Sequence, residues 1–266
     1  MKRKKTMNSD LFHKVYVKLL LSESDVCSFT KYASFSKANN LLNNFIKQVF
    51  YVAEKGFDSI KYCWNQGLEA QFKGKVINIV FEQNSKEKET LASFNPLTMP
   101  FEMCFNCSCI KQYETNEELL NYLKSKTFLV LLAHEVFHWE QTIEYGVPTM
   151  AKFVKEESEG KYSQLQIELE ACVFMVLKDA YLNYKKINSF DELENYTHSL
   201  SSSFLKTAKT LILNNLQEVK IILEQNKSFL TEAQDLIEQD NLNFMFDLVA
   251  TPVNKPLGYW KDWFKD

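Results

Sequence analysis

The chain carries no proline between Pro148 and Pro252, and it has few residues elsewhere that interrupt regular structure. Only 6 glycines and 5 prolines occur among its 266 residues. Because these two residue types end or break helices more strongly than any others, their scarcity favours long helical segments. We therefore expect an α+β fold that is predominantly helical, with a small sheet in the first half of the chain.

Local patterns in the first half of the chain predict one helix and a few strands. Residues 36–56 are interpreted as a helix with Ser36 as its N-cap. Residues 68–83 predict a β-hairpin, because a Lys-Gly turn signal separates two strand-like runs. Residues 84–103 are expected to be a loop, and residues 104–110 a further short strand.

Three helices are expected in the middle of the chain. A capping box at Thr115 predicts the start of one helix. A second helix should begin near Phe128 and stop by Gly146 and Pro148. A polar loop should follow it, and then a helix over about 164–186.

The last third of the chain is also expected to be helical. Apolar residues at four-three-four spacing predict one buried stripe, formed by Ile212, Leu216, Val219 and Leu223. A boundary near residue 189 would divide the chain into a core of residues 1–188 and a helical C-terminal region of residues 189–266. The alternative is that both parts belong to one domain.

Composition excludes several classes of protein. A net charge of −3 without a basic face argues against nucleic acid as a partner. No apolar run approaches the roughly 18 residues that a membrane span needs. The only basic run, residues 2–5, is interpreted as a solvated chain end. Six cysteines without an export signal are typical of reduced thiols, so we expect a cytoplasmic protein.

The segment LVLLAHEVFHWEQ contains the residues most typical of a chemical function. Positions four apart share one face of a helix, so His134 and His138 can offer two ring nitrogens to one metal ion. Glu135 projects beside them, where a carboxylate can take a proton from a metal-activated water. The alternative is a buried helix whose two histidines are bonded to backbone or carboxylate groups and bind no metal.

A catalytic zinc ion also needs a third protein ligand and one open position. The two remaining histidines, His13 and His198, are isolated in the sequence. The segment ELEA, near the start of the next predicted helix, offers Glu168 or Glu170. These two positions are about 200° apart around a helix axis, so only one can reach the metal. Helix geometry alone leaves the choice open.

HEVFH followed thirty residues later by ELEACVF resembles the gluzincin pattern of zinc metallopeptidases. The pattern is most similar to the ImmA/IrrE-type and HtpX-like (prenyl-protease-type) peptidases, over roughly residues 105–180. The resemblance implies a zincin-like core with a small sheet beside the motif helix. It also implies that Glu168 is the third zinc ligand. Glu135 is then the general base for hydrolysis of a peptide bond by a zinc-activated water.

Some positions match the resembled pattern and others depart from it. Phe174 matches an aromatic position, but Cys172 stands where an Asp or Asn usually supports a metal-bound histidine. Glu140 replaces a residue that is commonly hydrophobic. In such enzymes the edge strand of the sheet binds the substrate backbone. Residues 106–110 (NCSCI) or 76–80 (VINIV) could be that edge, or both could be ordinary core strands.

Further side chains are candidates for supporting roles. Gln141 lies on the same helical stripe as His134 and should border the site, unless it is a plain surface amide. A cysteine cluster could bind a metal ion or could consist of small buried side chains; its members are Cys104, Cys107 and Cys109. An oxyanion could be stabilised by any of five side chains, namely Tyr145, Tyr162, Tyr181, Tyr184 and His198.

The sequence therefore predicts a zinc metallopeptidase that acts on a protein or peptide substrate. His134, His138 and Glu168 are the predicted ligands of Zn²⁺, and Glu135 is the predicted catalytic residue. One alternative is a zinc-binding homologue that does not cleave. Another is a helical regulatory or interaction protein whose histidines are structural and bind no metal.

Overall fold

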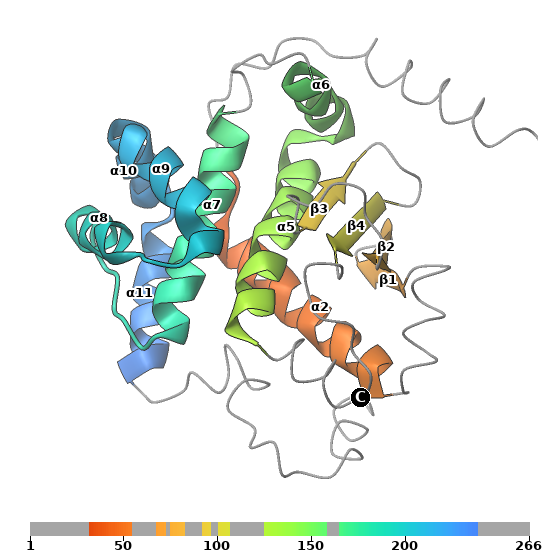
Figure 1. Ribbon diagram of the computed structural model, residues 1–266, viewed down its shortest axis with the longest axis horizontal. Helices are drawn as coiled ribbons and strands as arrows, with labels where there is room; N and C mark the ends of the chain where they lie inside the picture. The colour runs from red at the N-terminus through yellow and green to blue at the C-terminus, as the bar shows by residue number, and fades with distance from the viewer. Residues whose placement is uncertain are drawn as a thin grey trace, which may run out of the picture.

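The computed structural model describes residues 32–54, 68–72, 75–82, 92–96, 101–106, 125–158 and 165–238. These residues form a predominantly helical molecule with one small sheet (Figure 1). The helices are α2 (Phe35–Glu54), α5 (Lys126–Tyr145), α6 (Val147–Ser158), α7 (Leu165–Leu182), α8 (Phe190–Ser199), η3 (Ser203–Leu205), α9 (Lys206–Asn214), α10 (Leu216–Gln225) and α11 (Lys227–Glu238). The strands are β1 (Leu68–Phe72), β2 (Lys75–Glu82), β3 (Ala92–Asn95) and β4 (Phe101–Asn106). None of the described helices is both long enough and apolar enough to cross a membrane.

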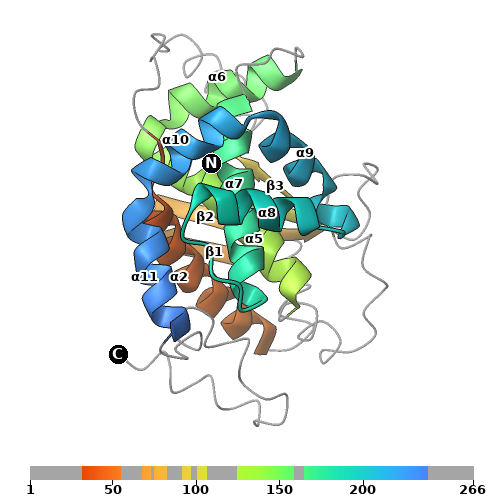
Figure 2. The same cartoon turned by 90° about the vertical axis from the view of Figure 1, so that its left-hand side faces the viewer.

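Helices α5 and α7 lie side by side between the sheet and the C-terminal helices (Figures 1 and 2). Helix α2 and strand β3 pack against α5, whereas α9 and α10 pack against α7. The main cluster of buried apolar side chains contains residues from both sides of residue 189. The boundary predicted there would cut through this shared core, and the division into 1–188 and 189–266 stays a prediction.

The four described strands form one sheet in the order β1-β2-β4-β3. Strands β1 and β2 are antiparallel, with Leu68 opposite Ile79 and Phe72 opposite Lys75, which confirms the predicted hairpin. Strand β4 pairs in parallel with β2 and antiparallel with β3. Strand β3 is therefore an edge of the sheet, and it is the strand that lies against α5.

Two predictions about the sheet are wrong. Residues 84–103 are not one loop, because they include β3 and the beginning of β4. The segment 76–80 (VINIV) lies in β2, which has a neighbour on each side, so it is not an edge strand. Of the segment 106–110 (NCSCI), only Asn106 belongs to β4, and the rest lies outside the described residues. The four residues of β3 carry a weak strand signal of their own, and they form a strand by pairing with β4, which begins soon after at Phe101.

Helix α5 has defined signals at both ends. The Oγ of Ser125 accepts a hydrogen bond from the backbone N–H of Phe128 at 3.2 Å, which caps the first turn. Gly146 follows the last turn with a φ of 84°, a conformation that glycine adopts without strain. Its N–H donates to the carbonyl of Thr142 at 3.1 Å. The predicted start near Phe128 and stop by Gly146 are confirmed.

The polar loop predicted after Gly146 is wrong in its first part, because α6 occupies Val147–Ser158. Pro148 lies in the first turn of this helix, where backbone N–H groups have no helical partner to lose. Met150 and Phe153 of α6 pack with Ile167 in a small second cluster of buried side chains. Helix α6 therefore covers the beginning of α7.

Other helix ends differ from the predictions in smaller ways. Helix α2 begins at Phe35, and its N-terminal N–H groups are capped by Ser34 rather than Ser36. The Oγ of Ser34 accepts from the N–H of Lys37 at 3.3 Å. Helix α7 ends at Leu182, a turn earlier than the predicted range of 164–186.

The apolar stripe predicted for one C-terminal helix is divided between two helices. Ile212 lies on α9, whereas Val219 and Leu223 lie on α10, and all three are buried. Asn215 separates the two helices: its side-chain Nδ2 donates to the carbonyl of Leu211 at 2.7 Å. Its backbone N–H closes the last turn of α9 through the carbonyl of Ile212 at 3.0 Å. The prediction of a helical, partly buried segment is thus confirmed, but a single continuous helix is wrong.

An extended segment, residues 32–34, runs into α2 and is fixed by side chains from distant helices. The backbone N–H of Phe35 donates to Asn226 Oδ1 at 2.8 Å, and Asn226 Nδ2 donates to the carbonyl of Ala33 at 3.4 Å. The N–H of Ala33 donates to Glu170 Oε2 at 3.1 Å. Asn226 and Glu170 thus hold the two ends of this segment against the C-terminal helices and α7.

Candidate metal centre

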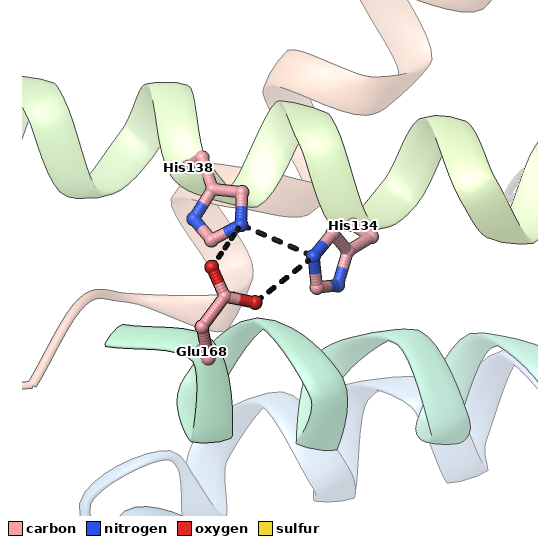
Figure 3. A group of neighbouring side chains, drawn as sticks. All are labelled: His134, His138 and Glu168. Atoms are coloured by element: carbon pink, nitrogen blue, oxygen red, sulfur yellow. Dashed lines mark hydrogen bonds and ion pairs between the residues drawn. The ribbon is translucent and has the colours of Figure 1, made fainter. Parts of the chain in front are cut away.

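Three side chains from two helices meet between α5 and α7 (Figure 3). His134 and His138 lie one turn apart on α5, and their Nε2 atoms are 3.1 Å from each other. Glu168 lies in the first turn of α7. Its Oε2 is 3.5 Å from His134 Nε2, and its Oε1 is 3.4 Å from His138 Nε2. These are the three residues that were predicted as metal ligands.

The spacing of the three groups fits a tetrahedral metal ion. Ligand atoms at about 2.0–2.1 Å from zinc lie about 3.3–3.4 Å from one another when the angles are tetrahedral. The distances here are 3.1, 3.4 and 3.5 Å. Two imidazoles and one carboxylate are also a donor set that zinc commonly has in catalytic sites, with a fourth position left open. The group could therefore hold a metal ion.

The charges within the group favour an ionised carboxylate. Burial alone would raise the pKa of Glu168, but His138 and His134 lower it to about 2. Because 41% of the Glu168 side chain is exposed, solvent moderates this attraction. Burial lowers the pKa of His138 and so favours the neutral ring, which is the form that binds metals. Burial acts in the same direction on His134, but contacts with Cys172 and Glu168 outweigh it and raise the pKa of that ring.

Glu135, the predicted catalytic residue, follows His134 on α5 and is only 5% exposed. Burial raises the pKa of Glu135 to about 7. The charge of His134 opposes this shift, and that of Glu168 adds to it. A carboxyl group with a pKa near neutrality can both accept and donate a proton around pH 7.

Glu170, the alternative third ligand, lies on another face of α7 and is fully buried. Its carboxylate accepts a hydrogen bond from the hydroxyl of Tyr145, which lies 2.9 and 2.8 Å from the two carboxylate oxygens. It also accepts from the N–H of Ala33 at 3.1 Å and from Gln166 Nε2 at 3.1 Å. Burial raises the pKa of Glu170 to about 7, although these hydrogen bonds oppose the shift. The structure therefore brings Glu168, and not Glu170, to the two histidines.

Gln141 borders the site, as predicted, and the alternative of a surface amide is wrong because it is fully buried. Its Oε1 lies 2.8 Å from Nδ1 of His138. Its Nε2 donates to the carbonyl of Ile167 at 2.9 Å and to Glu170 Oε2 at 3.3 Å. The helical stripe indicated the position of Gln141 on α5, but its partners on α7 could not be found without the packing of the two helices.

The two positions that depart from the resembled pattern are both buried. The thiol of Cys172 contacts His134 and contributes to the raised pKa of that ring. However, His134 Nδ1 has no partner in ordinary hydrogen-bond geometry, so we regard the thiol contact as weaker than the amide contact of His138. Glu140 is 1% exposed, and its charge helps to raise the pKa of Lys37.

The other candidate side chains lie elsewhere. Tyr145 donates to Glu170, Tyr181 is buried in the core, and Tyr184 is 67% exposed. His198 lies on α8, with Nε2 3.9 Å from Glu194, as expected for an isolated surface histidine. Several candidates lie outside the described residues, namely residues 2–5, His13, Cys107, Cys109, the helix start at Thr115, Tyr162 and the side chain of Cys104.

The cluster thus combines two imidazoles and one carboxylate facing a common point with a second carboxyl, Glu135, that titrates near pH 7. Helices α5 and α7 supply all four groups. Comparison of this chain with protein-family models, with curated protein sequences and with solved structures finds no match.

Proposed function

We propose that this protein is a zinc-dependent metallopeptidase of the gluzincin type. The observation that carries the proposal is the spacing of 3.1–3.5 Å among His134, His138 and Glu168, which suits one tetrahedral ion. These are also the residues that the HEVFH and ELEA motifs pair in the resembled families. Polar side chains that meet by chance have no reason to combine two imidazoles and one carboxylate at this spacing.

Each residue of the cluster then has a distinct role. His134, His138 and Glu168 hold the ion, and bound zinc supplies a Lewis acid for a water and for the carbonyl of the peptide bond. Glu135 accepts a proton from the attacking water and returns it to the leaving amine. The same group must act first as a base and then as an acid, and burial already brings the pKa of Glu135 to about 7 in the metal-free protein.

An extended peptide is the substrate class that suits the surroundings of α5. Strand β3 is at the edge of the sheet and lies against the helix that carries both histidines. A substrate segment added as a further strand beside β3 would run along α5, as in recognition by strand addition. Strand β3 takes this role in place of residues 76–80, which lie in a strand with a neighbour on each side.

A zinc-binding protein that does not cleave peptides is a second candidate. The observation that favours it is Cys172, a thiol where the resembled families have an Asp or Asn beside a metal-bound histidine. A weaker support for His134 would leave metal binding possible but the chemistry less well oriented. A helical interaction protein without metal is the third possibility, and it requires that the cluster bind no zinc.

The test substitutes Glu135 and compares it with a matched glutamate on the same helix. Glu135→Gln keeps the size of the side chain and removes the base, whereas Glu144→Gln changes a residue that pairs with Lys37 at 3.1 Å on the surface of α5. Zinc content is measured by mass spectrometry, and cleavage is measured with a peptide library. Glu135→Gln should retain its zinc and lose cleavage by roughly 10²–10⁴-fold. Glu144→Gln should behave as wild type in both measurements.

The outcomes separate the three candidates. Equal cleavage by wild type and Glu135→Gln would remove Glu135 from the mechanism. Stoichiometric zinc without cleavage by wild type would favour the non-cleaving zinc protein. Wild-type protein that neither contains zinc nor binds it on titration would contradict the metallopeptidase and leave the interaction protein.

A further inference from the structure

Gln141 joins the candidate metal centre to a buried polar network. It lies on α5 one turn after His138, and its side chain is fully buried. Its amide contacts three groups: His138 Nδ1 at 2.8 Å, the carbonyl of Ile167 at 2.9 Å and Glu170 Oε2 at 3.3 Å. The last two belong to the first two turns of α7, which also carry Glu168.

These contacts determine which way the amide faces. The backbone carbonyl of Ile167 can only accept a hydrogen bond, and so can the carboxylate of Glu170 when it is ionised. The NH₂ group of Gln141 must therefore face Ile167 and Glu170. The amide oxygen is then left for His138. Because that oxygen can only accept, Nδ1 of His138 must carry the proton. Nε2 of the neutral ring consequently keeps its lone pair, and this atom faces His134 and the acceptor oxygen of Glu168. Two acceptors that face each other in this way favour a cation between them, which is the position of the proposed metal ion.

The network around Glu170 prevents the amide from turning over. Glu170 receives hydrogen bonds from Tyr145, Gln166 and the backbone N–H of Ala33, in addition to the one from Gln141. A carboxylate held by donors from α5, α7 and the segment before α2 has no freedom to rotate away. If the amide of Gln141 turned over, its oxygen would face two acceptors, which is unfavourable in a buried site.

We propose that Gln141 is the positioning residue of this metal centre. It fixes the tautomer and the ring orientation of His138 and, through Ile167, the distance between His138 and the turn of α7 that carries Glu168. This inference rests on the proposed function only in that a metal uses the lone pair so presented. The arrangement of hydrogen bonds itself is a property of the metal-free protein.

The first measurement uses wild-type protein without metal. Nitrogen-15 NMR correlations within the histidine rings, recorded at mildly alkaline pH and assigned with a His138→Ala sample, identify which nitrogen carries the proton. The expected result is the Nδ1-protonated tautomer for His138. A predominantly Nε2-protonated ring would overturn the proposal, whether or not the protein binds zinc and whether or not any variant folds.

The second measurement uses two matched variants, Gln141→Met and Gln166→Met. Both glutamines donate to Glu170, but only Gln141 touches His138. Zinc affinity is measured by competition with a chromophoric chelator, and the ligand field by the visible spectrum of the Co²⁺ form. Gln141→Met should weaken zinc binding by about 10–100-fold and shift the Co²⁺ spectrum. Gln166→Met should leave the spectrum unchanged and alter the affinity by less than about threefold.

These results also separate the inference from the proposed function. If wild type binds zinc and both variants bind it equally well with unchanged Co²⁺ spectra, the role of Gln141 is wrong and the metallopeptidase proposal stands. If wild type shows the expected tautomer but binds neither zinc nor cobalt, the metallopeptidase proposal is wrong while the orientation of His138 by Gln141 is upheld.

Discussion

The two halves of helix α7 bury charged side chains in different ways. In the first two turns, Glu170 receives hydrogen bonds from four groups on several segments, and Glu168 faces the two histidines. In the last turns, Lys178 is 1% exposed and lies over the faces of Phe174 and Phe229, at 5.4 and 5.5 Å from the ring centroids. Its Nζ also donates to Oδ1 of Asn39.

The two ends of α7 differ in the kind of side chain that surrounds the charged group. In the first two turns, polar partners orient one another, and the oxygens of Glu168 are directed at a common point with the histidines. At the last turns, aromatic rings surround one cation, and burial lowers the pKa of Lys178 to about 7. Burial of a charge alone therefore does not mark a functional site on this helix. A set of mutually oriented polar groups is what distinguishes the candidate metal centre, and this contrast leads to four predictions.

The largest effect is expected within the first two turns, where two glutamates lie two residues apart. Glu168→Gln removes a direct ligand and should weaken zinc binding by more than about 100-fold, beyond the range typical of an indirect partner. Glu170→Gln should weaken it by less than about 10-fold, because Gln141 can still donate to the remaining carbonyl oxygen. Zinc titration of both variants measures the ranking. The reverse ranking would mean that α7 is rotated from the orientation described here.

A smaller effect is expected at the other end of α7. Lys178→Met replaces a buried cation by an apolar chain of similar length, so it should raise the free energy of unfolding at pH 7 by about 2 kcal/mol. Zinc affinity should not change. Urea unfolding measures the first quantity, with the exposed Lys185→Met as a control. A loss of stability in Lys178→Met would show that its bonds to Asn39 and the two rings outweigh the cost of burying the charge.

The same variant should change how stability depends on pH. The folded-state pKa of Lys178 is about 7, below its usual value of 10.5. Between these two values the unfolded chain binds more protons, so wild-type stability gains up to about 1.4 kcal/mol per pH unit from this group as pH rises. The advantage of Lys178→Met should therefore be constant below about pH 7 and decrease above it. An advantage that stays the same from pH 7 to pH 9 would contradict the lowered pKa.

The smallest effect is expected at Cys172, between the two halves. Its thiol contacts His134, but Nδ1 of that ring has no partner in ordinary hydrogen-bond geometry. Cys172→Ala should therefore change zinc affinity by less than about threefold, well below the ~10–100-fold typical of an outer-shell partner. The same chelator competition measures it. A loss as large as that of Gln141→Met would mean that Cys172 supports His134 as strongly as Gln141 supports His138.

The sequence was sufficient for features that depend on nearby residues. The helix that carries His134 and His138 has a capping serine before it and a glycine after it, so both ends could be predicted. The hairpin of β1 and β2 was also local. The choice of Glu168 over Glu170 came from the resemblance, because spacing along one helix cannot say how that helix is rotated against its neighbour.

Other features were missed, for different physical reasons. The four residues of β3 carry a weak strand signal of their own, and helix α6 begins in spite of Pro148 because the first turn tolerates proline. The apolar spacing continues without change across Asn215, so it does not indicate that α9 ends and α10 begins there. The role of Gln141 requires α7 to bring Ile167 and Glu170 to it, and no periodicity of α5 contains that information.

Asn226 forms a clamp on the segment before α2 through its hydrogen bonds with Phe35 and Ala33, and this clamp has a consequence for protein synthesis. It joins Phe35 to a residue 191 positions later in the chain. A ribosome produces His134, His138 and Glu168 before it produces Asn226, so a nascent chain holds all three candidate ligands while this clamp is still missing. Until Asn226 has been synthesised, its hydrogen bond to the carbonyl of Ala33 cannot help to hold Ala33 against Glu170. We expect the metal ligands to be present in the growing chain well before their surroundings are rigid, and the centre to become fully ordered only after Asn226 has been synthesised.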